Sequence, residues 1–434
     1  MLRYPAFRRV WLGAMVSSIG TWMEGLGMQW LMAEQTGSTV MLGWLAAAQL
    51  GPMLLLGIFG GLATDRLDRR RLLLTTQLAT MLIAAGLTVA SALDQATPTV
   101  LLALGLLGGI TLAFNAPAWQ VMTPRLVPRA ELHRAIALQG LQFNLARVVG
   151  PALAGLLLAQ TSATVLFALN TLSFVAVILA IRSTEPAPPP PGPAPPARAQ
   201  ILEALRFMFG DPGPRALLAM LVLLSALAAP LQRMLPLFVS EVFHADETAY
   251  GLLLGLFGAG AVLGGLTLGR WPTWYPRHHL IPLSLTLTGA CMTLFCATRS
   301  LALAGAWIFA GGLFWIWAFS GMITALQLRI SDTMRGRALS VANMAMFGAM
   351  PIGSLFAAVI GSWLAGSLTA AEPAAAAVQL GVGFSTLLLT VLGLLLLIWR
   401  TPQIDEEGPA NPPVARSLWQ GVTASAHRHR ARAS

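Results

Sequence analysis

A short, densely charged turn between two long apolar segments is the first place where this chain could do chemistry. The segment Gly60-Gly61-Leu62-Ala63-Thr64 leads into Asp65-Arg66-Leu67-Asp68-Arg69-Arg70-Arg71, in a chain of which only 10% of residues are charged. Partly desolvated carboxylate–guanidinium pairs are strong and directional. The acids and arginines of this turn could therefore form ion pairs that exchange as two parts of the protein move. The alternative is a set of arginines that only fixes orientation in a membrane, beside a solvated acid.

Glu24 is the only carboxylate near the middle of any apolar run. A charged side chain at the centre of a bilayer costs about 2.5 kcal/mol or more on insertion scales, so such residues usually face a cavity or a partner. Desolvation disfavours the charged form of a carboxyl group. Glu24 is therefore a candidate proton carrier. The alternative is a structural hydrogen bond between helices, to Gln49 or Asn144.

Two arginines also lie inside apolar runs. Arg147 precedes Pro151 by four residues, and the proline ring should displace the carbonyl of residue 147 and kink the helix beside a buried cation. Arg147 could hold an anionic group of a substrate or pair with Glu24. Arg233 lies between two prolines, nearer the outer end of its run. It could belong to an outer gate, or it could extend its charged group to the membrane interface.

Further polar side chains lie within the apolar runs or near their ends. A site for a drug-sized molecule is mostly apolar and has few polar groups. Some of these side chains are expected to line a cavity, and others only to join helices. The candidates are Gln49, Asn115, Gln120, Gln142, Asn144 and Asn343.

These residues need elements that can hold them in a membrane. The hydrophobic fraction is 56% and the mean hydropathy is +0.70, both far above the values of soluble proteins. Twelve apolar runs lie between residues 10 and 399, and each has the roughly 20 residues that a spanning helix needs. The sequence therefore predicts an all-α integral membrane protein with twelve transmembrane helices. A β-barrel would show alternating runs of about ten residues, which this chain lacks.

The net charge of +10 comes from arginine alone, because the chain has no lysine. If the N-terminus lies inside, the inner loops and tails hold 24 of the 27 arginines, and the outer loops hold only Arg299. This bias predicts a multi-pass protein with both termini in the cytoplasm. The arginines are thus accounted for by the orientation of the chain in the membrane. The expected partner is therefore the lipid bilayer and not nucleic acid.

The clearest boundary is residues 183–214, because eight prolines fall within 186–196 and exclude a span there. This cytoplasmic linker separates an N-terminal six-helix half, residues 1–182, from a C-terminal half, residues 215–400. Residues 401–434 are predicted to be a disordered cytoplasmic tail. An amphipathic helix is expected in the linker, either on the membrane surface or docked on the protein. Its apolar residues are Ile201, Leu202, Leu205, Met208 and Phe209.

The two halves repeat each other. Gly264-Gly265-Leu266-Thr267-Leu268-Gly269-Arg270 follows the opening turn by 204 positions, and the basic loops 125–135 and 329–338 share nearly the same offset. This supports a parallel 6+6 duplication, the arrangement of transporters whose halves rock about a central site. The second copy has Gly269 in the place of Asp65.

Runs of Gly-x-x-x-Gly predict close contact between the halves through spans 2, 5, 8 and 11, so the protein is expected to be monomeric.

Together these features resemble the major facilitator superfamily. Its loop signature, roughly G-x-L-x-D-R-x-G-R-R, is matched by Gly61, Asp65, Arg66, Arg69 and Arg70, with Asp68 where a glycine is usual. A closer likeness is to the drug and siderophore exporter branch that includes the enterobactin exporter. It rests on residues 18–23 (S-I-G-T-W-M), 114–120 (F-N-A-P-A-W-Q) and 144–155 (N-L-A-R-V-V-G-P-A-L-A-G).

The resemblance implies a secondary active transporter of the bacterial cytoplasmic (inner) membrane. It implies that Asp65, Arg66, Arg69 and Arg70 form a charge relay that holds the inner gate shut in the outward-facing state. We expect proton-coupled efflux of small amphipathic molecules, drug-like or siderophore-like, by alternating access. The proton gradient would supply the energy, and no cofactor is expected. The alternative is an importer or symporter of a small metabolite on the same fold; the 6+6 repeat disfavours a channel or a receptor.

Several motifs are missing. The chain has no phosphate-binding G-x-x-x-x-G-K-[ST] loop, no zinc-type Cys/His spacing and no serine nucleophile elbow. ATP-driven transport by this chain, a metal site and enzymatic activity are therefore not expected. Cys291 and Cys296 fall on different faces of one span and are predicted to pack in the interior rather than to form a disulfide.

Overall fold

The computed structural model describes residues 3–122, 126–128, 131–184, 197–268, 276–330, 335–367, 372–399 and 401–405. Within these ranges every long element is an α-helix, as the apolar runs predict. The N-terminal half consists of α1 (Pro5–Thr36), α2 (Thr39–Arg66), α3 (Arg69–Ala92), α4 (Pro98–Met122), α5 (Leu132–Gln160) and α6 (Ala163–Arg182).

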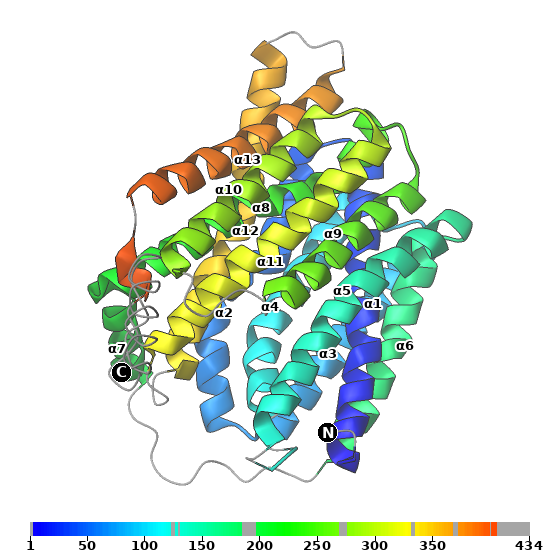
Figure 1. Cartoon of the computed structure of the whole chain (residues 1–434). Coiled ribbons are helices and arrows are strands. Elements are labelled where there is room, and N and C mark those ends of the chain that lie inside the picture. The colour runs from blue at the N-terminus through cyan, green and yellow to red at the C-terminus, as the bar shows by residue number, and fades with distance from the viewer. Residues whose placement is uncertain are drawn as a thin grey trace, which may run out of the picture.

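A shorter helix, α7 (Ala197–Gly210), precedes the C-terminal half. That half consists of α8 (Pro212–Leu237), a π-helical turn η3 (Phe238–Val242), α9 (Glu247–Leu268), α10 (Arg277–Ala297), α11 (Leu301–Arg329), α12 (Arg335–Ser367) and α13 (Pro373–Trp399), and a 3-10 turn η4 (Pro402–Asp405) follows it. Figure 1 shows the first half in blue to teal and the second in green to orange, with the N-terminus at one end of the bundle.

Local sequence explains where the helices begin and end. Gly37 follows α1 with φ of 54°, a left-handed conformation that glycine adopts without strain. The hydroxyl of Ser38 accepts a hydrogen bond of 3.3 Å from the amide of Met41 and caps α2. The carboxylate of Asp68 accepts one of 2.8 Å from the amide of Arg71 and caps α3. The acid that replaces the usual glycine of the loop signature is therefore a helix cap.

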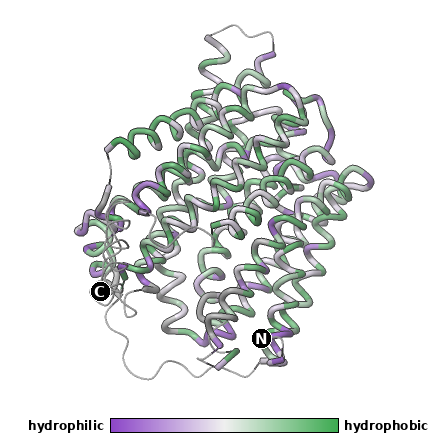
Figure 2. Tube along the Cα trace, viewed as in Figure 1, coloured by the Kyte–Doolittle hydropathy of each residue, from purple (hydrophilic) through white to green (hydrophobic). Residues whose placement is uncertain are grey.

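Eleven helices of the described chain are long and apolar enough to cross a membrane. The remaining long helix, α1, has 32 residues, but glutamate, glutamine and serine residues within it lower its hydropathy. It packs against α5 and α6 like a member of the bundle. Figure 2 shows apolar residues along the length of the helices and hydrophilic residues gathered at the two ends of the bundle. This pattern is that of a multi-pass membrane protein.

The two halves repeat their packing. In the first half α1 contacts α5 and α6, α2 contacts α4, and α3 contacts α4 and α6. In the second half α8 contacts α12 and α13, α9 contacts α11, and α10 contacts α11 and α13. If α7 is not counted, α8 to α13 correspond in order to α1 to α6, and corresponding pairs of helices are in contact. The predicted duplication is therefore visible in three dimensions.

The glycines of the opening motif show the same repeat. A Cβ atom on Gly60 would lie 2.0 Å from the carbonyl oxygen of Ala113 on α4, and one on Gly264 would lie 2.5 Å from that of Leu313 on α11. Gly61 and Gly265 instead face open space. Close helix contact therefore requires the first glycine of each pair and not the second.

The halves meet through two pairs of helices. α2 packs on α12, and α5 packs on α9, which Figure 1 shows side by side. These are spans 2, 11, 5 and 8, as the sequence predicts. A Cβ atom on Gly155 of α5 would lie 2.7 Å from the Cα of Gly251 on α9, so here the two backbones touch.

The linker helix α7 is docked on the protein. It packs on α8 and α12, and Ala204 and Met208 are fully buried there. Leu202 and Phe209 remain exposed. Glu203 forms an ion pair of 2.7 Å with Arg337 of α12. The structure thus places one part of the apolar face against the bundle and leaves the other part free to contact lipid.

The prediction of disorder from residue 401 is wrong for the first residues of the tail. η4 is packed against the C-terminal half, where Ile404 is fully buried. The carboxylate of Asp405 contacts the ring of His278 and accepts a hydrogen bond of 2.8 Å from the amide of Arg277, at the start of α10. A capped helix and a buried pair therefore fix this segment, whereas residues 406–434 lie outside the described part of the chain.

Candidate functional site

The two membrane-embedded arginines lie at mid-depth and reach across the boundary between the halves. Counted at 1.5 Å per residue from the bundle end opposite the N-terminus, Gln49, Glu24 and Arg147 lie roughly 15–20 Å along their helices, and Arg233 lies roughly 14 Å along α8 and η3. A hydrocarbon core is about 30 Å thick. The four residues thus lie in one central layer of the bundle, away from both of its ends.

Arg147 belongs to α5 but contacts the C-terminal half. Its guanidinium carbon lies 4.8 Å from the ring centroid of Phe257 on α9 and 4.4 Å from that of Trp315 on α11. Only 6% of the residue is exposed. Among the described residues no acid pairs with it, and no ion pair with Glu24 is present. Cation–π contacts thus take the place of the pairing with Glu24 that the sequence left open.

Arg233 belongs to α8 but contacts the N-terminal half. Its Nη1 donates a hydrogen bond of 3.1 Å to Oε1 of Gln49 on α2. The amide nitrogen of Gln49 lies 3.5 Å from the sulfur of Met28 on α1. The side chain of Arg233 therefore points into the bundle at this contact and does not extend to the membrane interface.

Glu24 is held by a residue that the sequence analysis missed. Nδ2 of Asn170 on α6 donates a hydrogen bond of 2.7 Å to the Glu24 carboxylate, and Oγ of Ser173 donates one of 3.1 Å to the amide oxygen of Asn170. Asn170 is fully buried, whereas Glu24 keeps partial exposure. The signal was present in the sequence, because an asparagine in the middle of the apolar run 164–181 needs a polar partner.

Gly20 allows this arrangement. A Cβ atom at Gly20 would lie 2.4 Å from the amide oxygen of Asn170 and 2.7 Å from the hydroxyl of Ser173. The close approach of α1 and α6 thus brings Asn170 within reach of Glu24, which is one turn further along α1. The carboxylate is therefore held in place by neutral groups, which tolerate both its charged and its protonated form.

The end of the bundle opposite the N-terminus is closed by contacts between the halves. The rings of Trp30 on α1 and Tyr250 on α9 stack with centroids 5.9 Å apart, and the Tyr250 hydroxyl donates a hydrogen bond of 3.5 Å to Oε1 of Gln29. The hydroxyls of Thr39 on α2 and Ser362 on α12 lie 3.4 Å apart. Together with the contact of α5 and α9 at their glycines, they join the halves at this end.

Two of the predicted cavity residues join helices within one half. Nδ2 of Asn115 on α4 donates a hydrogen bond of 3.1 Å to the hydroxyl of Thr76 on α3. Nε2 of Gln142 on α5 donates one of 3.0 Å to the hydroxyl of Ser18 on α1. Their side chains stabilise the N-terminal half. The side chains of Asn144 and Gln120 lie outside the described residues.

The charged turn after α2 is described only in part, because the side chains of Asp65 and Arg66 lie outside the described residues. Arg70 donates hydrogen bonds of 3.3 and 2.5 Å to the carbonyls of Ile181 and Arg182, and so caps the end of α6. Nε of Arg69 donates one of 3.2 Å to the carbonyl of Thr64. These two arginines thus fix the turn to the ends of α2 and α6.

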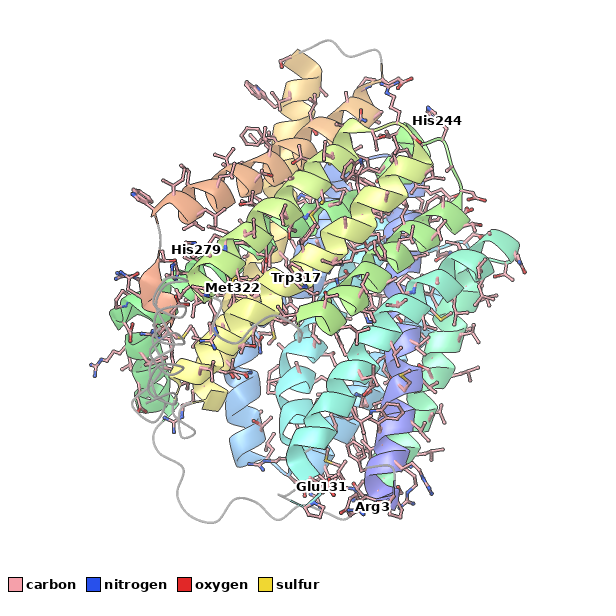
Figure 3. The ribbon with its side chains drawn as sticks, viewed as in Figure 1. Arg3, Glu131, His244, His279, Trp317 and Met322 are labelled. Atoms are coloured by element: carbon pink, nitrogen blue, oxygen red, sulfur yellow. The ribbon has the colours of Figure 1, made fainter. Side chains whose placement is uncertain are left out.

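Ion pairs at the N-terminal end act within one half or on the linker. Arg3 pairs with Glu131 at 2.8 Å, and Figure 3 shows the two residues side by side at this end. Arg329, at the end of α11, donates hydrogen bonds of 2.9 and 3.1 Å to the carboxylate of Asp211, which precedes α8. In the described chain no group of His, Cys, Asp and Glu residues is arranged to hold a metal ion. Cys291 and Cys296 are free and buried, as predicted.

Solved transporter structures share this fold. A bacterial homologue of the human lysosomal transporter Spinster, in an inward-facing and unoccupied conformation, superposes with a TM-score of 0.71 at 14% identity, over 92% of this chain and 96% of that one. A D-xylose–proton symporter superposes with a TM-score of 0.68 at 16% identity, over 96% of this chain and all of the other. The described part of the chain thus has the same fold as these two proteins.

The chain belongs to the transmembrane secretion effector family of the major facilitator superfamily, whose pattern it matches over residues 1–411. It is 28% identical to the enterobactin exporter EntS of Salmonella typhimurium over 93% of this chain and 96% of the exporter. It is 26% identical to the staphyloferrin A transporter of Staphylococcus aureus over 79% of this chain and 86% of that one. Macrolide efflux protein A of Streptococcus pyogenes is also 26% identical, over 81% of this chain and 88% of that protein.

Proposed function

We propose that the protein exports small amphipathic molecules, drug-like or siderophore-like, in exchange for protons. The observation that carries the proposal is the position of Glu24. It is the only carboxylate near the middle of a described span, and its hydrogen-bond partner is the neutral amide of Asn170. A carboxylate without a cation at this depth reduces its desolvation cost by taking up a proton. Glu24 therefore has the setting of a proton-coupling residue.

The contacts between the halves support alternating access as the transport mechanism. Several contacts between the halves lie within about two turns of the end opposite the N-terminus. With both termini in the cytoplasm, as the arginine distribution predicts, this is the outer end. Export requires these contacts to open while the cytoplasmic ends come together. Asp65 and the neighbouring arginines would then hold the cytoplasmic ends together in the outward-facing state.

The relatives support the direction of transport. Two of the names state export, those of the enterobactin exporter EntS and macrolide efflux protein A. The name of the staphyloferrin A transporter states the cargo without a direction. The apolar and aromatic residues of the central layer suit a lipophilic or anionic cargo better than a sugar, which needs more hydrogen-bonding side chains.

The test is transport by inverted membrane vesicles, in which an exporter accumulates its cargo. Vesicles with and without the protein would be energised and incubated with a panel of dyes, macrolides and siderophores, with and without an uncoupler. We expect accumulation that depends on the protein and that the uncoupler abolishes. Uptake into whole cells without accumulation in inverted vesicles would instead indicate an importer.

A further inference from the structure

No described residue accepts a hydrogen bond from the buried guanidinium group of Arg147. A guanidinium group has five N–H donors, all directed from its planar edge. Its described contacts are the rings of Phe257 and Trp315, which attract its charge but offer no carboxylate or carbonyl oxygen. Among the described residues no hydrogen bond or ion pair reaches its side chain. With 6% exposure the residue has little access to bulk water.

The surrounding layer does not supply the missing negative charge. Among the described residues, the hydrogen-bond acceptor of Arg233 is the amide oxygen of Gln49, and Glu24 is bound by Asn170 on α6. Among the described residues the mid-depth layer therefore holds two guanidinium groups and one carboxylate that contacts neither. An uncompensated buried charge is costly, and an anion that binds beside it removes part of that cost.

The aromatic rings beside Arg147 determine which kind of anion can bind there. Phe257 and Trp315 contact the guanidinium, and the ring of Trp315 also stacks on that of Phe319, with centroids 5.1 Å apart and planes 7° apart. A planar oxyanion can bind the guanidinium edge with two parallel hydrogen bonds. The stacked rings provide an apolar surface for the rest of the same molecule. Because Arg147 comes from one half and the rings from the other, such a ligand contacts both halves at once.

We infer that Arg147, Phe257 and Trp315 form a binding site for the carboxylate group of an amphipathic cargo. This rests on the proposed export function, since it assigns the chemical class of the molecule that is exported. The site selects for anionic amphipathic molecules over cationic ones of the same shape.

The test uses two dyes that share the xanthene skeleton and differ in charge: carboxyfluorescein, an anion, and rhodamine 123, a cation. Their binding to the purified full-length protein would be measured by fluorescence anisotropy. We expect the wild type to bind carboxyfluorescein more tightly. Arg147→Met should weaken carboxyfluorescein binding about tenfold or more, the loss expected for a charge-assisted hydrogen bond, and leave rhodamine binding unchanged. Arg147→Lys keeps the charge but not the planar guanidinium group. Its affinity for carboxyfluorescein should lie between those of the wild type and Arg147→Met.

Arg299→Met is the matched control, because Arg299 is exposed in an outer loop. This substitution should not change the binding of either dye. Retained rhodamine binding shows that Arg147→Met is folded. Equal binding of the two dyes by the wild type, or an equal loss of both in Arg147→Met, would overturn the site. Failure of the wild type to accumulate any cargo in inverted vesicles would refute export, whereas a selective loss of carboxyfluorescein binding would still establish the site.

Discussion

Nη1 of Arg233 on α8 donates a hydrogen bond of 3.1 Å to Oε1 of Gln49 on α2, so a cation of the C-terminal half is bound by the N-terminal half. Arg147 makes the reverse connection, from α5 to the rings of Phe257 and Trp315. Each half thus contributes one buried cation to the other within the central layer. In the alternating access that we propose, rocking of the halves would break both connections or change their partners, and so would link the central layer to the state of the transporter.

A cysteine pair at the outer end should lock the protein in the closed arrangement. The hydroxyls of Thr39 and Ser362 lie 3.4 Å apart on α2 and α12, so Thr39→Cys with Ser362→Cys places two thiols close enough for a disulfide. The native Cys291 and Cys296 would first be replaced by alanine. Oxidation should abolish transport and a reductant should restore it. Each single cysteine variant is the control, and transport that persists in the cross-linked protein would argue against alternation at this contact.

Gln49→Leu should weaken that closed arrangement. The substitution leaves the Arg233 guanidinium without its only described hydrogen-bond acceptor, at a cost of about 1–3 kcal/mol. The expected result is slower cross-linking of the Thr39→Cys, Ser362→Cys pair. Gln142→Leu is a matched control, because Gln142 bonds only to Ser18 within its own half. Equal cross-linking rates in the two variants would show that the Arg233 contact does not affect the balance between states.

The adjacent glycines of the opening motif should differ in their effect on stability. Gly60→Ala places a Cβ atom 2.0 Å from the carbonyl oxygen of Ala113, and such overpacking costs about 1–3 kcal/mol. Gly61→Ala meets no atom within 4 Å, and alanine favours a helix by about 1 kcal/mol over glycine. We expect a lower Tm for the first and an unchanged or higher Tm for the second. The reverse order would mean that α2 and α4 pack differently.

The fold could be predicted from the sequence because bilayer length and arginine distribution are strong, local signals. The contacts of the arginines could not be predicted, because they depend on which face of each helix meets the other half. The sequence does not decide the partner of Arg147, because the two rings that contact it come from α9 and α11 of the other half. Asn170 was overlooked since one polar residue in an apolar run does not show its partner. The burial of His278 could not be predicted either, because it depends on η4, which folds back and places Asp405 against the His278 ring.

Asp65→Asn should shift the balance between states away from the outward-facing one, because it removes the charge of the proposed cytoplasmic latch. The measurement is the cross-linking rate of the outer cysteine pair, which should increase as the closed outer end becomes more populated. Asp68→Asn is the matched control: its side chain caps α3 through the amide of Arg71, and asparagine caps helices equally well. An unchanged rate in Asp65→Asn would contradict the latch.

The docked segment after α13 should contribute to stability. A chain that ends at residue 400 loses buried Ile404 and the Asp405 carboxylate that pairs with His278 and caps α10. A chain that ends at residue 405 keeps them. We expect the shorter chain to have a Tm several degrees below that of the full-length protein, and the longer one to match it. Equal thermal unfolding of the two truncated chains would show that the segment is not needed.

Proton coupling through Glu24 is the central claim, and the most direct test is substrate-dependent proton movement in proteoliposomes that contain a pH-sensitive dye. Glu24→Gln keeps an acceptor oxygen for Asn170 but cannot release a proton. Glu34→Gln, at an exposed position on the same helix, is the control. We predict that addition of cargo moves protons in the wild type and in Glu34→Gln, and that Glu24→Gln exchanges cargo down its gradient without moving protons. Cargo-driven proton movement by Glu24→Gln at the wild-type rate would contradict this mechanism.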